Sequence, residues 1–109
     1  MDKETIDKVE ALVEEVVEEY DLNIEKVIVF GSRAREDYTD ASDIDLLIVS
    51  QDFENVAWNQ RPGPLYEAWN YDQLPTPEFV CLTPNEFEDK KDRKPHIVNN
   101  AAEEGIEIA

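Results

Sequence analysis

Two short apolar runs constrain the fold of this chain more than any other feature of its sequence. Residues 27–30 and 46–49 are each four consecutive apolar side chains, and no apolar run is much longer. Such runs are too short for helices and are typical of strands that are covered on both faces. They predict strands over residues 26–30 and 42–50, the second of them central in its sheet. No run is long enough to cross a membrane, so no membrane partner is expected.

The remaining elements are predicted from apolar spacing and from helix-end signals. Apolar residues recur at three-four spacing over residues 3–20, with Asp2 as a candidate N-cap, which predicts an amphipathic helix. Thr83, followed by Pro84 and then by Glu86, forms a capping-box signal directly after a third strand over residues 78–83. We also expect a helical turn over residues 32–37, a helix over residues 95–104 and a short edge strand over residues 106–109.

Residues 51–76 carry no clear periodicity. Prolines and a glycine interrupt the segment, and only residues 64–69 suggest a short helix. We expect an irregular insertion that covers an edge of the sheet. Its aromatic side chains could stack on a base, cover the sheet or dock a partner; they are Trp58, Tyr66, Trp69 and Tyr71.

The length and the cysteine content predict a single cytoplasmic domain. A chain of 109 residues has room for one core, so residues 1–109 are expected to form one domain. The single cysteine, Cys81, cannot form an internal disulfide, and no basic-then-apolar secretory signal follows Met1. The expected fold class is α/β (α+β), with a small mixed central sheet flanked by helices.

The charge excludes some partners and leaves others open. With 27 acidic and 10 basic residues, the net charge is −17, which argues against binding long nucleic acids or anionic lipid. The acidic residues are spread over the whole chain. They are typical of a solvated acidic surface, as in halophilic proteins from a salt-rich cytoplasm, and a negative face for a basic partner protein is the alternative.

Two aspartates begin the second predicted strand. Asp43 and Asp45 lie two residues apart, so both point to the same face, which Leu47 and Val49 continue into the core. Like charges at the rim of an apolar surface need a shared proton, an arginine or a divalent cation such as Mg²⁺. In so acidic a chain, an isolated Asp-x-Asp pattern is also common without any function.

A glycine-serine turn and a third acid strengthen the prediction of a functional site around the two aspartates. Gly31-Ser32 follows the first strand, where free backbone N–H groups and a hydroxyl suit phosphate oxygens. Arg33 and Arg35, two of the four arginines, lie in the same turn and could bind phosphate or pair with the acids. Glu78 begins the third strand and would join the aspartates if the two strands are neighbours in register.

Together these residues resemble a known pattern. Gly31-Ser32, ten intervening residues and Asp43-Ile44-Asp45 are similar to the active-site motif of the DNA polymerase β-like nucleotidyltransferases. The similarity is greatest to the minimal nucleotidyltransferases, which are stand-alone domains of about this length. It covers residues 27–49, and residues 78–82 resemble the strand that carries the third acid of the family.

The resemblance implies an activity and residue roles. The activity is transfer of a nucleoside monophosphate, AMP in the first place, from an NTP such as ATP to a hydroxyl acceptor, with release of pyrophosphate. Asp43 and Asp45 would bind one or two Mg²⁺ ions, and Glu78 would complete the metal site or help to deprotonate the acceptor. Gly31, Ser32 and the two nearby arginines would hold the phosphates.

The resemblance also implies a partner. Minimal nucleotidyltransferases commonly occur beside small helical HEPN proteins as toxin–antitoxin pairs. The chain could neutralise such a partner by modifying it or simply by covering it, so a non-catalytic binding module is the alternative function. A degenerate, metal-free domain is a third possibility. Because no basic surface is present, protein or small-molecule acceptors are favoured over long nucleic acids.

Overall fold

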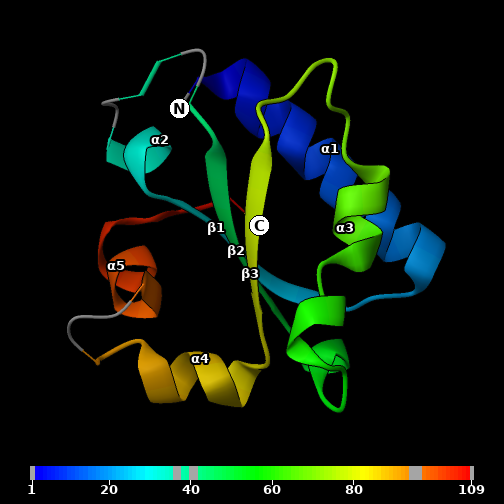
Figure 1. Ribbon diagram of the computed structural model, residues 1–109, viewed down its shortest axis with the longest axis vertical. Helices are drawn as coiled ribbons and strands as arrows, with labels where there is room; N and C mark the ends of the chain where they lie inside the picture. Colours follow the sequence, from blue (N-terminus) through cyan, green and yellow to red (C-terminus); the bar gives the residue numbers. More distant parts are fainter. Residues whose placement is uncertain (1, 36–37, 40–41, 94–96, 109) are drawn as a thin grey trace.

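A four-stranded sheet with helices on both faces forms the centre of the molecule (Figure 1). The computed structural model describes residues 2–35, 38–39, 42–93 and 97–108. The strands are β1 (Ile24–Phe30), β2 (Ile44–Ser50), β3 (Pro77–Leu82) and β4 (Ile106–Glu107). The α-helices are α1 (Lys3–Tyr20), α2 (Ser32–Arg35), α3 (Gly63–Ala68), α4 (Pro84–Lys90) and α5 (Ile97–Glu104).

The sheet is mixed, as the sequence predicts. Its strand order is β3-β2-β1-β4. β1 runs antiparallel to both β2 and β4, whereas β2 and β3 are parallel. The parallel pair is joined through residues 51–76, which include α3, so this segment forms the crossover between the two strands.

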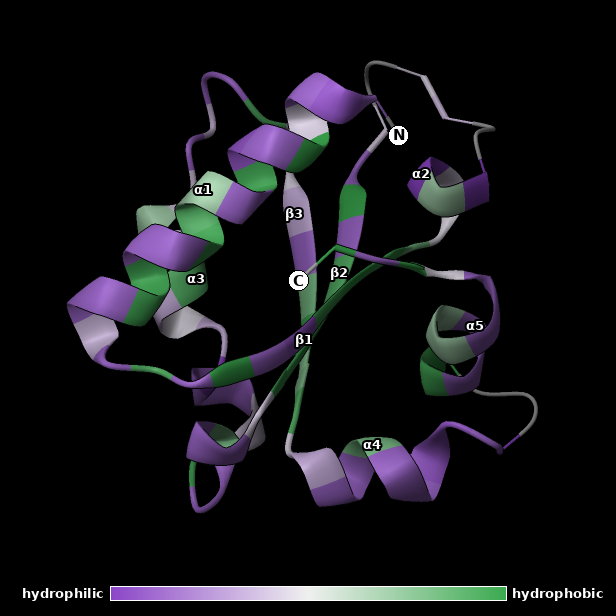
Figure 2. Cartoon of the chain, turned by 180° about the vertical axis from the view of Figure 1, so that it is seen from behind, coloured by the Kyte–Doolittle hydropathy of each residue, from purple (hydrophilic) through white to green (hydrophobic). Residues whose placement is uncertain are grey.

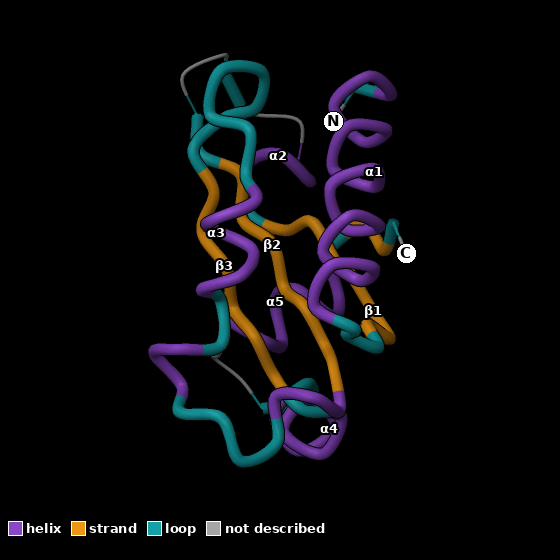
Figure 3. Tube along the Cα trace, turned by 90° about the vertical axis from the view of Figure 1, so that its right-hand side faces the viewer, coloured by secondary structure: helices purple, strands orange, loops and turns teal. Residues whose placement is uncertain are grey.

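Both faces of the sheet are buried, which explains the apolar runs. Side chains of β1 and β2 alternate between two core clusters, so consecutive residues are covered by different helices. One cluster packs against α1 and α3, and the other packs against α4 and α5. Figure 3 shows α1 and α3 in front of the strands, with α5 behind them. In Figure 2 the hydrophobic colour runs along much of β1 and β2 and recurs on α1 and α3.

The predicted helix ends are largely confirmed. The Thr83 hydroxyl accepts a bond from the Glu86 backbone N–H at 3.2 Å, and the Glu86 carboxylate accepts from the Thr83 N–H at 2.8 Å, so α4 has its capping box. Asp2 occupies the N-cap position of α1, but its carboxylate accepts from the Thr5 hydroxyl at 2.7 Å instead of capping the backbone. The expected turn and helix match α2 and α5, while residues 36–37 and 94–96 lie outside the described residues.

The aromatic side chains of residues 51–76 divide into two groups. Trp69 is buried and donates its indole N–H to the Pro75 carbonyl at 2.9 Å. Tyr66 packs edge-on against Phe79 of β3, with 4.9 Å between the ring centroids. Trp58 and Tyr71 are more than half exposed, at 55% and 57%. Packing therefore accounts for Trp69 and part of Tyr66, and the other two rings remain available at the surface.

Arg61 ties this segment to the outer strand of the sheet. Its guanidinium donates to the carbonyls of Val56 (3.0 Å) and Cys81 (3.1 Å) and to the carboxylate of Glu86 (2.6 Å). β3 is an outermost strand of the sheet, so without Arg61 the Cys81 carbonyl would lack a hydrogen-bond donor from a neighbouring strand. The hydrogen bond from Arg61 also holds the pKa of Glu86 below its usual value.

None of the described helices is long and apolar enough to span a bilayer. This finding agrees with the short apolar runs of the sequence.

We expect Arg61→Ala to lower the free energy of unfolding by about 1–3 kcal/mol, because the Cys81 carbonyl and the Glu86 carboxylate lose a shared donor. Urea unfolding at pH 7 measures the change. The matched control is Arg93→Ala, which removes only an exposed pair with Asp89 and should cost no more than about 0.5 kcal/mol. Equal losses in the two variants would contradict this role of Arg61.

Candidate active site

The end of one strand and the beginnings of two others meet at one edge of the sheet. Phe30, the last residue of β1, pairs with Asp45 near the start of β2. Asp45 in turn pairs with Glu78 near the start of β3. The parallel register therefore brings Glu78 beside Asp45, as the sequence analysis required if these strands were neighbours.

Gly31 makes the turn out of β1 possible. Its φ is +74°, a left-handed backbone conformation that residues with a Cβ rarely adopt. A Cβ at this position would also collide with Oδ2 of Asp45. The Gly31 carbonyl accepts bonds from the N–H groups of Ala34 and Arg35, both at 3.2 Å, and so starts α2. The glycine thus brings the turn against the carboxylate of Asp45.

The acids influence one another electrostatically. Burial, a hydrogen bond to Glu78 and the charges of Glu78 and Asp43 raise the pKa of Asp45 from its usual 3.8 to about 6. The positive charge of Arg35 acts in the opposite direction on this pKa, and more weakly. The predicted acids and one predicted arginine are therefore close enough to interact, with excess negative charge at the edge.

This arrangement is open and is not a preformed metal cage. Asp43 and Glu78 are exposed and Asp45 is half-buried. Among the described residues, which include all three acids, no three His, Cys, Asp or Glu side chains are positioned to hold a metal ion together. The uncompensated charge at Asp45 fits a divalent cation, whose remaining ligands would be water and substrate oxygens. The three-acid metal set from the sequence stays a prediction.

The two arginines of the turn differ in their surroundings. Arg35 is exposed and near the acids, which suits a contact with phosphate. Arg33 is buried; its guanidinium donates to the Ser42 carbonyl at 2.9 Å and lies 4.4 Å from the ring centroid of Tyr38. Arg33 therefore supports the chain just before Asp43, while its contact with a nucleotide stays a prediction.

Sequence reasoning did not identify Tyr38 or Thr39 as part of this support. The Thr39 N–H donates to the Ser42 hydroxyl at 3.0 Å, and the Ser42 N–H donates to the Thr39 carbonyl at 3.0 Å. A Thr-x-x-Ser segment immediately before Asp43 is a turn signal that could have indicated this closure. Ser32, the predicted phosphate ligand, is half-buried at the first position of α2.

A family model described as a nucleotidyltransferase domain matches residues 9–108. This chain belongs to the nucleotidyltransferase domain family. The resemblance based on Gly31-Ser32 and Asp43-Ile44-Asp45 is therefore confirmed, because both motifs lie inside the matched region. In this nucleotidyltransferase domain, both motifs are found at the sheet edge described above.

A solved structure and a curated relative are similar to this nucleotidyltransferase. The first is the crystal structure of "a putative nucleotidyltransferase from Sulfolobus solfataricus". It has a TM-score of 0.62 and 29% sequence identity, covering 82% of this chain and 76% of that one. The second is a "Putative protein adenylyltransferase" of Methanocaldococcus jannaschii, 62% identical over 34 residues. That match spans 30% of this chain and 34% of the relative.

We expect Gly31→Ala to destabilise the domain by about 1–3 kcal/mol, through the unfavourable φ and the collision with Asp45. Gly63→Ala is the matched control, because a Cβ there meets no atom within 4 Å. It should change stability by less than about 0.5 kcal/mol. Chemical denaturation of both variants measures the difference, and a Gly31→Ala variant as stable as the control would contradict the proposed close approach.

We expect Glu78→Gln to stabilise the metal-free protein at pH 7–8. Because the folded-state pKa of Asp45 is raised, its stabilising contribution is complete below about pH 3.8 and is lost as pH rises through about 6. Removing the Glu78 charge lowers the pKa of Asp45. It should therefore raise the free energy of unfolding at pH 7–8 by about 0.5–1 kcal/mol, allowing for solvent screening. The gain should disappear near pH 4.

Thermal unfolding from pH 4 to 8 with a chelator present measures this effect. Glu25→Gln, at an exposed position of β1, removes the same charge away from the edge and serves as the control. A pH-independent gain in Glu78→Gln, or the same gain in Glu25→Gln, would show that net charge and not Asp45 is responsible.

Proposed function

We propose that this nucleotidyltransferase transfers AMP from ATP to a hydroxyl group of a protein. The observation that carries the proposal is the pairing of Asp45 with Glu78 across β2 and β3, beside the Gly31 turn and within reach of the Asp43 charge. The pattern combines acids for a cation with a backbone turn for phosphates, the two requirements of NTP chemistry.

The residues would divide the work between the reacting groups. Asp43 and Asp45 would hold one or two Mg²⁺ ions together with substrate and water oxygens. When bound, the ion would neutralise charge on the triphosphate. The Gly31–Ser32 backbone and the Ser32 hydroxyl would bind the β- and γ-phosphates, and Arg35 would add a charged donor. Arg33 would support the chain just before Asp43 through its hydrogen bond to the Ser42 carbonyl.

In the proposed reaction the acceptor hydroxyl oxygen forms a bond to the α-phosphorus of ATP. The bond from that phosphorus to the oxygen shared with the β-phosphate breaks, and pyrophosphate leaves with the electron pair. The proton of the hydroxyl passes to a carboxylate, and we assign this role to Glu78, which is exposed and is not one of the two proposed cation ligands. The chain mainly supplies position, by holding the phosphates and the acceptor in line.

A protein acceptor is favoured by charge and by similarity. The net charge of −17 repels a long nucleic acid, whereas a polypeptide acceptor meets no such barrier. The relative from Methanocaldococcus jannaschii carries the name of a protein adenylyltransferase, although the match covers about a third of it. Both observations support a protein as the acceptor and AMP as the transferred group.

A binding function without chemistry is the second candidate, and the same acidic surface favours it. A partner of the HEPN type, which the family resemblance implies, would then be neutralised by association alone. Co-expression with the product of a neighbouring HEPN gene separates the two functions. Full neutralisation by Asp43→Asn would indicate association, whereas its loss in a variant that still binds the partner would indicate transfer.

The direct test incubates the protein and candidate acceptor proteins with Mg²⁺ and ATP labelled either at the α- or at the γ-phosphate. We expect label from the α-phosphate only, since the β- and γ-phosphates leave together. Asp43→Asn and Asp45→Asn should abolish labelling, and Glu78→Gln should reduce the rate by about 10²-fold or more.

Asp92→Asn provides the matched control, because Asp92 is exposed and lies just beyond α4, away from the site. It should label at the wild-type rate. Transfer of the γ-label, or unchanged labelling by Asp43→Asn, would overturn the proposed reaction.

A further inference from the structure

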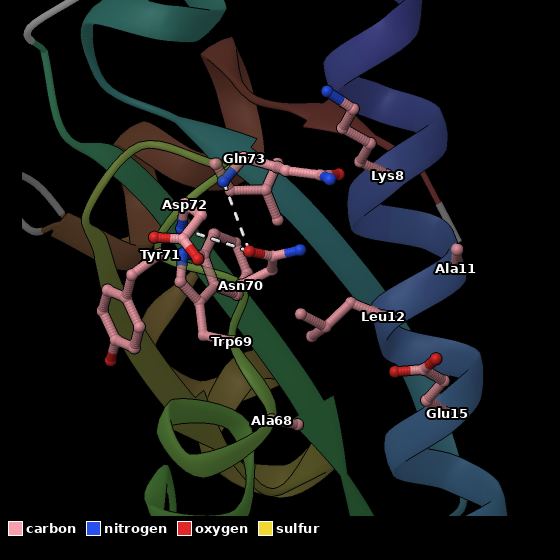
Figure 4. A pocket seen from close by; sticks show the side chains of 11 residues that line it. Lys8, Ala11, Leu12, Glu15, Ala68, Trp69, Asn70, Tyr71, Asp72 and Gln73 are labelled. Carbon is pink, nitrogen blue, oxygen red and sulfur yellow. Dashed lines mark hydrogen bonds between the residues drawn. The ribbon is translucent and has the colours of Figure 1, made fainter.

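A cavity lies on the face of the sheet opposite to the acids. It has a volume of about 660 Å³ and is formed between α1 and residues 68–74 (Figure 4). Leu12 and Trp69 of its lining belong to the core cluster on the α1 side, together with Ile44 and Leu46. Asp45 alternates with those two residues along β2 and so points to the other face. The cavity is therefore distinct from the proposed ATP site.

The floor of the cavity is apolar and rigid. Leu12 and Trp69 are about 5% exposed, and the Trp69 indole is fixed by its bond to the Pro75 carbonyl. Figure 4 shows Leu12 and Glu15 projecting from α1, with the side-chain amides of Asn70 and Gln73 projecting toward that helix. The volume suits a single large side chain or a small molecule, with polar groups around an apolar base.

The charges around the cavity favour a positively charged ligand. Glu15 and Asp72 line it, and within the described part of the chain neither carboxylate has a hydrogen-bond or ion-pair partner. The single basic lining residue, Lys8, is already paired with Glu4 at 3.3 Å. The cavity therefore carries uncompensated negative charge, which disfavours phosphates and carboxylates.

We propose that this cavity binds an arginine side chain of a partner polypeptide. The aliphatic stem of an arginine would cover Leu12 and Trp69, and its guanidinium would donate to one of the two lining carboxylates, with the charge of the other adding to the attraction. A basic segment also complements the net charge of −17, which a second copy of this chain would only double.

The location connects this docking site to the reaction. Asp72, Gln73 and Leu74 also line a smaller cavity of about 440 Å³, which extends to Arg33 and Tyr38 beside the glycine turn. Residues 72–76 then lead directly into β3 and Glu78. The two cavities thus share residues 72–74, and the smaller one lies beside the turn that leads to the acids. The role of a bound polypeptide as the acceptor rests on the proposed function, but the binding itself does not.

The test titrates the nucleotide-free protein with three blocked tripeptides, Ac-Gly-Arg-Gly-NH₂, Ac-Gly-Gln-Gly-NH₂ and Ac-Gly-Glu-Gly-NH₂, and follows amide NMR signals. We expect the arginine peptide alone to shift the signals of residues 8–15 and 68–74, saturating in the range of about 1–10 mM. Equal shifts with the glutamine peptide, or no shifts in these residues, would overturn the proposal.

The matched variants are Glu15→Gln and Glu14→Gln. Both residues are exposed on α1 and are adjacent in sequence, but only Glu15 lines the cavity. We expect Glu15→Gln to weaken binding at least about 3-fold and Glu14→Gln to leave it unchanged, within the strength of a single charged contact. Equal weakening would show general attraction to an acidic chain and would overturn the site.

Asp43→Asn separates this inference from the proposed reaction. It should bind the arginine peptide as the wild-type protein does, even when it transfers no label. Peptide binding without any transfer by the wild-type protein would contradict only the proposed reaction, and transfer without peptide binding would contradict only the docking site.

Discussion

The close approach of Gly31 to Asp45 is the constraint on which the site depends. β1 and β2 pair up to Phe30 and Asp45, so the chain leaving β1 must turn immediately beside a carboxylate. Glycine suits this path best, because the φ of +74° is strained for residues with a Cβ and because a Cβ would meet the Oδ2 atom of Asp45. The backbone pairing of two buried strands therefore places the turn beside the residue that carries the acid.

The acidic charge of the protein opposes the binding of an anionic nucleotide at the proposed site. A chain with a net charge of −17 would repel a triphosphate, and the mutual repulsion of Asp43, Asp45 and Glu78 adds to that barrier. The proposed divalent cation would relieve this repulsion, since it would compensate charge that Arg35 alone does not. The apolar support beneath the acids comes from Leu47 and Val49, which belong to the core cluster on the α4 and α5 side.

Local sequence signals were sufficient for most elements. The three-four spacing of residues 3–20 and the Thr83–Glu86 capping box depend on near neighbours in the chain, and both are found in α1 and α4. The consecutive apolar residues of β1 and β2 correctly indicated a sheet covered on both faces. Less could be predicted for residues 51–76, where Arg61 acquires its role from Cys81 and Glu86, partners 20 and 25 residues away.

The sequence by itself determined the family, the central strands and the local motifs of the site, because glycine, capping and alternation effects act over a few residues. Only the tertiary structure decided that Glu78 pairs with Asp45, that Arg33 is buried under the chain before Asp43, and that α1 and residues 68–74 enclose a cavity. These relations follow from the parallel register of β2 and β3 and from the packing of helices on opposite faces. Both are set by the burial of the whole core and by no single stretch of residues.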